Sequence, residues 1–573
     1  MHLNLQQLHA PEWAQKGYDL PKFDVERVRA AAPRWVHFGA GNIFRSFIAC
    51  AQQTVLDKGL CDHGIVVCEG FDPEIVERAY RPFDNLSVAV SLKANGGIDK
   101  RLVASVVESL TFADMARLQE IFASPALQMA SFTITEKGYD PKFAHAPGSL
   151  MGTLADLRQF PQDLNVYAKA AGPDKALLDA EEQAAQDARF NRIFFGPWDM
   201  GKTSMRKRDV AAIFRRARGF KRDDIRWSQT EWDQISRNAH LRTFPSRAQA
   251  AITVRNTDLR EMPTHETRFS EPTPDSRANP FDYFQYSLLP PGTPLLIAHT
   301  SLDGRWHFVE CPVAGGWVDA EDVALVDQEF KSVWRSGRYA ALLRDKVTLP
   351  GVGPNGGDGQ ANIGTMLPLN SESAEGGLRV LVPLKGPDGM ARSAEVVLAK
   401  GDAVPKPLPL TPGNVAGVGN VMMGQRYGWG GMFGDRDCSA LTRELFTPFG
   451  LWLPRNSGAQ ARMGVVQPLE GLSAKEKEAL ILNNGVPFLS LVGMRGHITL
   501  YVGKYKGRAA IFHNVWGVRT IEDGNDDARF IIGRAVVTSI TPGAELKNLY
   551  RPMTFADRLR TLSTLAGSRR EPY

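Results

Sequence analysis

A cysteine and two histidines in the last third of the chain have the types and order that nucleophilic catalysis needs. Cys438 is followed by Leu441, Leu445 and Phe446, which are apolar residues at helical intervals. This spacing predicts that the sulfur lies at a helix N-terminus, where the macrodipole favours thiolate and pKa values of about 3.5 to 7.5 are known. We therefore expect a reactive thiolate at Cys438.

A thiolate also needs a proton shuttle before an amine can leave. His497 begins the alternating segment "HITLYVG", and His513 lies farther on in "IFHNVWG". A hairpin return would bring the two histidines side by side, one as the base and the other orienting it. Seen separately, a cysteine or a strand histidine more often belongs to the core, but the three together favour catalysis.

Three sequence blocks around these residues are long and specific. "YGWGGMFGDRDCSALT", "MRGHITLYVGK" and "IFHNVWG" resemble the signature blocks of the NlpC/p60 family of papain-like cysteine peptidases, which cut peptidoglycan stem peptides. The resemblance implies that Cys438 is the nucleophile, His497 the general base and His513 the orienting residue.

The same resemblance also implies substrate-binding residues. Tyr427, Asp437 and Ser439 match positions that the family uses to shape the pocket and to bind the free amine of an N-terminal L-alanine.

The resemblance reaches back to about residue 155. "FNRIFFGPW", "PFDYFQYSLLPPGTPLLIAHTSLDGRWHFV" and "GGWVDAEDVA" resemble the helical segment and bacterial SH3-like domains of one subgroup. Members built this way are γ-D-glutamyl-diaminopimelate endopeptidases that act on trimmed muropeptides, and an SH3-like wall narrows their pocket. Four aromatic residues suit either such a wall or an SH3 core: Phe281, Tyr283, Phe284 and Tyr286.

A second candidate site lies near the N-terminus. "VHFGAGNIFRSF" places Gly39 and Gly41 in a strand-to-helix turn, where a pyrophosphate can approach the backbone, although Phe44 occupies the third glycine position of the fingerprint. With "PFDNLSVAVSL" and "SFTITEKGYD", it resembles the first part of the mannitol dehydrogenase family of polyol and hexuronate dehydrogenases, over about residues 15–145. By position, Glu69 would bind the adenosine ribose and favour NAD.

The catalytic lysine motif of that dehydrogenase family, which resembles K-x-R-x-L-N, is not found in this sequence. A hydride-transfer enzyme also needs a closed substrate pocket and a proton donor beside the nicotinamide. We therefore expect a catalytically silent segment with, at most, residual NAD binding.

The fold class follows from the order of these patterns. Strand-like and helix-like segments alternate over residues 34–139, which predicts a parallel sheet, and short alternating segments between turns predict small barrels over 245–405. The Pro-rich "AVPKPLPLTPGN" predicts an extended linker. We expect a multidomain chain: a truncated α/β Rossmann-like segment (1–150), a helical connector (151–244), two SH3-like β-barrels (245–325 and 326–405) and an α+β papain-like peptidase domain (406–573).

Bulk properties exclude several classes of protein. The 573 residues predict two to four domains, and the net charge of +5 is too small to indicate a nucleic-acid partner. No apolar run approaches the ~20 residues of a membrane span, and the first residues lack a secretory signal, so we expect the cytoplasm, or the cell envelope if the N-terminus is not native. Five cysteines without metal-ligand spacing predict reduced thiols and no metal site.

Two weaker motifs have simpler interpretations. "GPWDMGKT" fits the P-loop pattern, but Pro197, Trp198 and Asp199 would crowd bound phosphates, which argues against an NTPase. The basic tract "MRKRDVAAIFRRARGFKR" favours a solvated helix face.

The predicted function is a cell-wall peptide hydrolase that cleaves the γ-D-glutamyl-diaminopimelate bond of peptidoglycan stem peptides or muropeptides by a Cys-His-His mechanism, with no cofactor. The alternatives are an NAD-dependent polyol or hexuronate dehydrogenase-like protein and a non-catalytic peptidoglycan-binding module.

Overall fold

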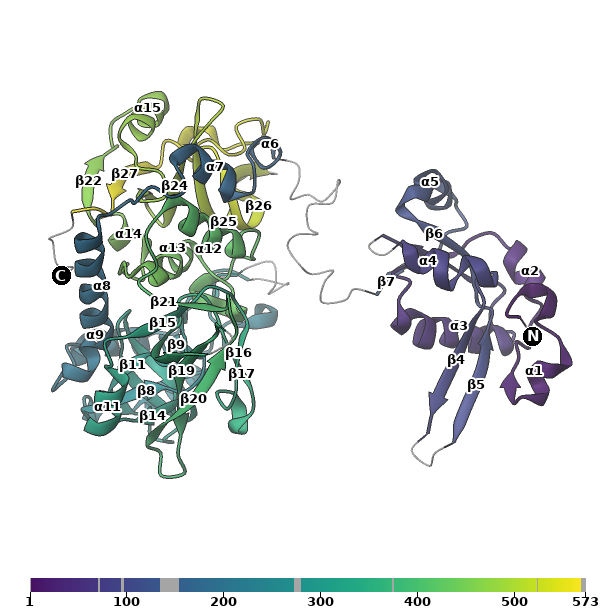
Figure 1. Cartoon of the computed structure of the whole chain (residues 1–573), viewed down its shortest axis with the longest axis horizontal. Helices are drawn as coiled ribbons and strands as arrows, with labels where there is room; N and C mark the ends of the chain where they lie inside the picture. The colour runs from purple at the N-terminus through teal and green to yellow at the C-terminus, as the bar shows by residue number, and fades with distance from the viewer. Residues whose placement is uncertain are drawn as a thin grey trace. The chain divides into compact units, whose positions relative to one another are not determined.

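The computed structural model describes residues 2–70, 73–93, 97–133, 154–272, 280–373, 376–522 and 524–567. The chain divides into unit 1 (Met1–Phe143) and unit 2 (Ala144–Tyr573), shown in Figure 1. The predicted boundary at residues 150–151 and the end of "SFTITEKGYD" (134–140) fall outside the described residues. Within the described ranges, no helix has the length and apolar content to cross a membrane.

A four-stranded parallel sheet forms the centre of unit 1, in the order β6-β3-β2-β7. Strand β3 has the sequence "IVVCE" and is buried throughout, as expected where helices cover both faces of a parallel sheet. The α/β character predicted for this segment is confirmed. Its strands and helices are β2 (Trp35–Phe38), β3 (Ile65–Glu69), β6 (Val106–Thr111), β7 (Met129–Phe132), α3 (Ala49–Asp57), α4 (Glu74–Ala79) and α5 (Met115–Ala123).

The segment "NLSVAVSL", one of the strand-like segments within the predicted alternation over residues 34–139, lies outside this parallel sheet. It forms β4 (Ser87–Leu92), which pairs antiparallel with β5 (Ile98–Val103) in a second sheet that also contains β1 (Tyr18–Asp19). A short connection makes this hairpin the nearest partner for β4, so the alternation of strand and helix patterns overestimated the parallel sheet. Two short helices, α1 (Pro11–Gln15) and α2 (Val25–Ala30), complete unit 1.

Unit 2 begins with helices α6 (Ala155–Gln159), α7 (Leu164–Ala171), α8 (Ala180–Phe195) and α10 (Gln229–Ala239). The helix predicted for the basic tract is mostly absent, because only α9 (Lys207–Val210) and short 3-10 turns form there. Gly219, near the end of the tract, could not continue a helix: its φ is +79°, and a Cβ would lie 2.3 Å from the Phe269 carbonyl oxygen. The P-loop-like stretch is a 3-10 turn after α8 that buries Trp198, so it forms no phosphate loop.

Two β-sheets dominate the middle of unit 2. One has seven strands in the order β10-β9-β13-β12-β11-β8-β14, and the other has five in the order β20-β19-β18-β15-β21. The strands of the first sheet are β8 (Gln249–Thr253), β9 (Thr257–Arg260), β10 (Gln285–Leu289), β11 (Pro294–Thr300), β12 (Trp306–Glu310), β13 (Gly315–Asp319) and β14 (Val323–Leu325). Those of the second are β15 (Tyr339–Leu342), β18 (Met366–Glu372), β19 (Leu378–Lys385), β20 (Ala391–Leu398) and β21 (Ala403–Lys406).

Two smaller features accompany these sheets. Strands β16 (Val347–Leu349) and β17 (Gly359–Ala361) pair as an antiparallel two-stranded ribbon, and helix α11 (Gln328–Trp334) lies between β14 and β15 in the chain. The predicted linker "AVPKPLPLTPGN" is partly wrong, since its first residues are β21, an edge strand paired with β15. An edge position tolerates Pro405, which has no N–H to donate.

The C-terminal part of unit 2 packs helices on a six-stranded sheet, in the order β22-β27-β23-β24-β25-β26. Figure 1 shows this part above the β-rich part within unit 2. The helices are α12 (Pro412–Met422), α13 (Cys438–Phe446), α14 (Ser457–Gln460) and α15 (Ala474–Asn484). The strands are β22 (Val465–Pro468), β23 (Ser490–Met494), β24 (His497–Tyr505), β25 (Arg508–Glu522), β26 (Asn525–Thr538) and β27 (Leu559–Thr564).

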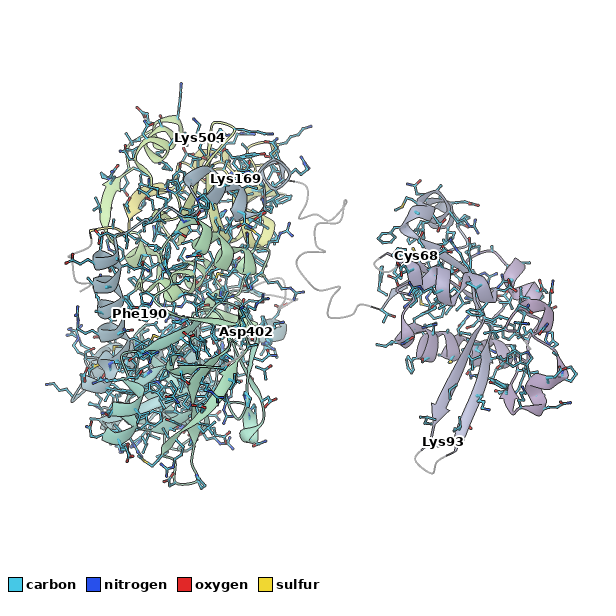
Figure 2. All side chains as sticks on the ribbon, in the orientation of Figure 1. Cys68, Lys93, Lys169, Phe190, Asp402 and Lys504 are labelled. Atoms are coloured by element: carbon cyan, nitrogen blue, oxygen red, sulfur yellow. The ribbon has the colours of Figure 1, made fainter. Side chains whose placement is uncertain are left out.

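Helix α8 joins the two parts of unit 2. Phe190, labelled in Figure 2, meets Trp452 of the C-terminal part edge-on at 5.2 Å, and Phe195 meets Tyr339 of the β-rich part at 5.7 Å. The Gln183 amide also donates to the Leu408 carbonyl at 2.7 Å. One helix therefore buries apolar side chains against both parts and fixes them together.

Candidate active site

Helix α13 places Cys438 at its first turn, as predicted. Asp437 is the N-cap, and its carboxylate accepts hydrogen bonds from the backbone N–H groups of Ser439 (3.1 Å) and Ala440 (2.8 Å). The side of the helix that carries Leu441 is fully buried in the core, which orients the whole helix. Cys438 itself is only 5% exposed, so its thiol faces a closed site.

The two histidines lie side by side on β24 and β25. His497 Nε2 is 2.8 Å from His513 Nδ1, and His513 Nε2 is 3.0 Å from Thr538 Oγ1. Thr538 Oγ1 donates its only hydrogen to the Ser539 carbonyl at 2.7 Å, so it must accept from His513 Nε2. Neutral His513 then accepts at Nδ1 from His497 Nε2–H, and the network assigns His497 a free lone pair on Nδ1.

The Cys438 thiol lies against the start of β24, the strand that begins with His497. The Ile498 backbone N–H hydrogen-bonds to the Cys438 sulfur, and Ile498 is the residue after His497 in β24. Helix α13 packs directly on β24 and β25. The structure therefore pairs the two predicted histidines and places the predicted cysteine beside the strand that carries His497.

The predicted thiolate is not supported. Burial, and then the negative charge of Asp437, raise the pKa of Cys438 to about 12, and these effects exceed the stabilisation from the Ile498 N–H and Arg455. Burial likewise lowers the pKa of His497 to about 3 and that of His513 well below its usual value. In the resting site the thiol and both imidazoles are therefore neutral.

Sequence reasoning missed Arg455, which holds the start of α13. Its guanidinium donates to both Asp437 carboxylate oxygens, at 2.7 Å and 3.1 Å, and to Ser439 Oγ at 2.9 Å. Its Nε donates to Ser287 Oγ of the first β-sheet at 3.0 Å. Arg455 thus neutralises a buried carboxylate and ties the β-rich part to the candidate site. Its place in the segment "LPRNS" gave no signal of this role.

An aromatic cluster contains the predicted pocket residue Tyr427. Phe281 lies 5.4 Å from Trp429, 6.0 Å from Tyr427 and 6.0 Å from Trp516, measured between ring centroids. Tyr283 meets Trp429 at 5.8 Å. Residues of the β-rich part therefore form a wall against the loop that precedes Cys438.

The other two aromatic residues of that group lie elsewhere. Phe284 is fully buried and packs against Trp232 in the core of the first β-sheet, so its interpretation as a core residue is correct. Tyr286 is 38% exposed on β10.

A small cavity of about 30 Å³ lies against α13. Its lining comes from the first β-sheet, from the segment between β17 and β18, and from the C-terminal part, and includes Ser287, Thr365, Arg443 and Arg455 but not Cys438. It therefore belongs to the junction of these parts rather than to the reacting groups.

The glycine-rich turn of unit 1 has the expected geometry. Gly39 has a φ of +109°, and a Cβ there would lie 2.8 Å from the Thr133 carbonyl oxygen, so only glycine fits. Nothing lies within 4 Å of a Cβ built on Gly41, which leaves its backbone open to a ligand. Glu69 accepts from the Ala40 N–H at 2.7 Å and so lies on the turn, at the carboxyl end of β3. These residues fit a dinucleotide; among the described residues no group of His, Cys, Asp or Glu fits a metal ion.

Comparison with known families decides the assignment of unit 2. Residues 424–522 match the NlpC/P60 family, residues 267–319 match an SH3 domain (SH3b1 type), and residues 126–244 match the NLPC_P60 stabilising domain, N term. The chain contains an NlpC/P60 domain. Because this family consists of cysteine peptidases, the NlpC/P60 domain supports a cell-wall peptidase, and such a domain needs no cofactor. With the SH3 domain, it also supports peptidoglycan as the substrate.

Two known proteins are similar to separate stretches of this chain. The solved structure of an NlpC/P60 endopeptidase from Photobacterium damselae subsp. piscicida covers 72% of this chain and 98% of its own, with 24% identity and a TM-score of 0.63, which shows the same fold. D-mannonate oxidoreductase from Thermotoga maritima is 47% identical over 135 residues, or 22% of this chain. The chain spans 25% of that relative's length, and the predicted mannitol dehydrogenase-like segment is confirmed.

Proposed function

We propose that unit 2 is a γ-D-glutamyl-diaminopimelate endopeptidase acting on peptidoglycan stem peptides, with Cys438, His497 and His513 as its catalytic residues. The observation that supports it best is the 2.8 Å bond between the two histidines, beside the start of α13 in the segment that matches the NlpC/P60 family. Fixed tautomers and a closed site are what acyl transfer by a neutral thiol requires.

Bond cleavage begins with proton transfer, because the Cys438 thiol is neutral. As Cys438 Sγ attacks the γ-D-glutamyl carbonyl carbon, its proton passes to His497 Nδ1, and His513 and Thr538 stabilise the imidazolium through the bonded chain. His497 then gives this proton to the departing diaminopimelate amine, which leaves a thioester on Cys438. Water, deprotonated by His497, hydrolyses the thioester and restores the thiol.

In this proposal the L-alanine end of the substrate lies toward the β-rich part. Tyr427 belongs to the aromatic wall, and Asp437 and Ser439 lie beside it, each 5% exposed. Arg455 and three backbone N–H groups already bond the Asp437 carboxylate, so this carboxylate is firmly oriented. The binding of an L-alanine amine by Asp437 and Ser439 stays a prediction.

The deciding experiment uses the tripeptide L-Ala-γ-D-Glu-meso-diaminopimelate. The full chain should release free diaminopimelate, Cys438→Ala should not, and Cys311→Ala should act normally, because Cys311 is the other cysteine of unit 2 and lies in the β-rich part. Failure of the unmodified chain to cleave would reject the proposal. Sedimentation with purified peptidoglycan without cleavage would favour the alternative of a binding module.

We also propose residual NAD binding by unit 1, without dehydrogenase activity. The required glycine at 39, the open backbone at Gly41 and the placement of Glu69 support it, together with the oxidoreductase likeness. Calorimetric titration with NAD should show saturable binding that Glu69→Ala weakens, and heat indistinguishable from dilution would reject it.

A further inference from the structure

The segment before β27 packs against the histidine pair, a contact that no sequence motif indicated. The Phe555 ring meets His497 at 5.7 Å and His513 at 5.5 Å, both edge-to-face. Three residues later, Arg558 Nη2 donates to the Arg495 carbonyl at 3.1 Å. Arg495 lies in the turn two residues before His497, so Arg558 is held beside the proposed base.

The charges around the two reacting groups differ. Asp437 and Arg455 are the charged residues that act on the Cys438 thiol. The charge that acts most strongly on the His497 imidazole is instead Arg558, which helps burial to lower its pKa. Arg558 lowers the pKa of His497 by more than Asp437, the other charged residue that acts on it, raises this pKa. Positive charge therefore prevails at the base, whereas the thiol lies beside the Asp437–Arg455 ion pair.

Arg558 is available to a ligand. Its side chain is exposed, and within the described part of the chain its hydrogen-bond partner is a carbonyl group rather than a carboxylate. Arg519 of β25 and Arg529 of β26 face each other across the strand pair and add positive charge near Arg558. Guanidinium groups that lie close together attract an anion and prefer carboxylates, which each group can bond with two N–H donors.

We infer that Arg558 binds a carboxylate of the leaving group and so makes diaminopimelate preferred over lysine at that position. The leaving amine must take its proton from His497, so the amino acid that carries this amine lies on the Arg558 side of the scissile bond. Diaminopimelate carries a carboxylate at the far end of its side chain, whereas lysine lacks this group. This inference rests on the proposed endopeptidase function and adds a specificity-determining residue to it.

The experiment compares two tripeptides, L-Ala-γ-D-Glu-meso-diaminopimelate and L-Ala-γ-D-Glu-L-lysine. One charge-assisted contact at a partly exposed position predicts that kcat/KM for the unmodified chain favours the diaminopimelate peptide by about tenfold. Arg558→Gln should remove most of this preference by lowering kcat/KM for the diaminopimelate peptide alone. Arg560→Gln is the matched control, since Arg560 follows two residues later and pairs with Glu470 at 3.3 Å.

The possible results separate the two proposals. A preference unchanged in Arg558→Gln, or equal losses on both peptides, would overturn the assignment of Arg558 and leave the endopeptidase intact. No cleavage of either peptide by the unmodified chain would overturn both. Product inhibition gives a test that needs no variant: free meso-diaminopimelate should inhibit the unmodified chain about tenfold more strongly than lysine, and equal inhibition would also refute the contact.

Discussion

The hydrogen-bonded chain behind His497 makes Thr538 the sharpest test of the proposed chemistry. Thr538 is fully buried, and its hydroxyl fixes the Nε2–H tautomer of His513 through the 3.0 Å bond. In Thr538→Val, His513 can shift its proton to Nδ1 and donate to His497 Nε2. His497 then carries its own proton on Nδ1, where the Cys438 proton must arrive, so the base is lost.

The size of the effect follows from the group left unbonded. A buried N–H of His513 without an acceptor costs about 1–3 kcal/mol, which favours the wrong tautomer. Since about 1.4 kcal/mol corresponds to a factor of ten, kcat should fall roughly tenfold, with little change in KM.

The assay measures initial rates of diaminopimelate release. Thr538→Ser, which keeps the hydroxyl, is the control and should retain most of the activity. Nitrogen-15 spectra of histidine-labelled protein should show the tautomer shift in Thr538→Val but not in Thr538→Ser. If Thr538→Val kept a kcat within about twofold of Thr538→Ser, the tautomer assignment would be refuted.

Three further predictions concern stability. Because burial lowers the pKa of His497 to about 3, the unfolded chain binds a proton below pH 6.5 that the folded chain excludes. In urea unfolding, His497 alone should therefore lower the free energy of unfolding of unit 2 by about 1.4 kcal/mol per pH unit once the pH is below 6.5, and the other buried histidines with lowered pKa values, His299, His307 and His513, add to this slope; a flat profile would contradict this. Arg455→Met should lower the free energy of unfolding of unit 2 by about 3–5 kcal/mol in the same assay, because the buried Asp437 carboxylate then has no positively charged partner. Gly39→Ala should lower the melting temperature of unit 1 without affecting peptide cleavage, whereas Gly41→Ala should change neither the melting temperature nor the cleavage. If both variants lowered the melting temperature equally, the claim that residue 39 must be glycine would be rejected.

The helix and strands that carry the candidate catalytic residues were predictable because the spacing of apolar residues and the order of the segments along the chain were both informative. Cys438 begins a helix because an N-cap residue precedes it and apolar residues recur one turn apart. His497 and His513 lie on adjacent antiparallel strands because each belongs to an alternating segment joined by a tight turn. Their roles, like the exact domain boundaries, stay predictions until the variants are made.

The supporting residues were not predictable, because long-range packing positions them. Thr538 lies on β26, and nothing in its local sequence indicates that its hydroxyl meets His513. Phe555 and Arg558 reach the site only through the pairing of β27 with β23, which brings a distant segment beside the histidines. Pairing between strands far apart in sequence is the information that local periodicity lacks.

The direction of the Cys438 pKa shift shows a second limit of prediction from sequence, which concerns charges rather than contacts between distant residues. A helix N-terminus favours thiolate, but the residue that caps this helix is Asp437, whose carboxylate lies beside the sulfur and opposes the macrodipole. Arg455 offsets part of that charge, and burial adds a cost that no composition reveals. A thiol kept neutral until substrate arrives cannot form a stable ion pair with His497, so attack and proton transfer must be coupled. The tautomer that Thr538 holds is therefore a requirement of this site, because His497 has to be ready to accept at Nδ1 whenever a carbonyl carbon comes within reach.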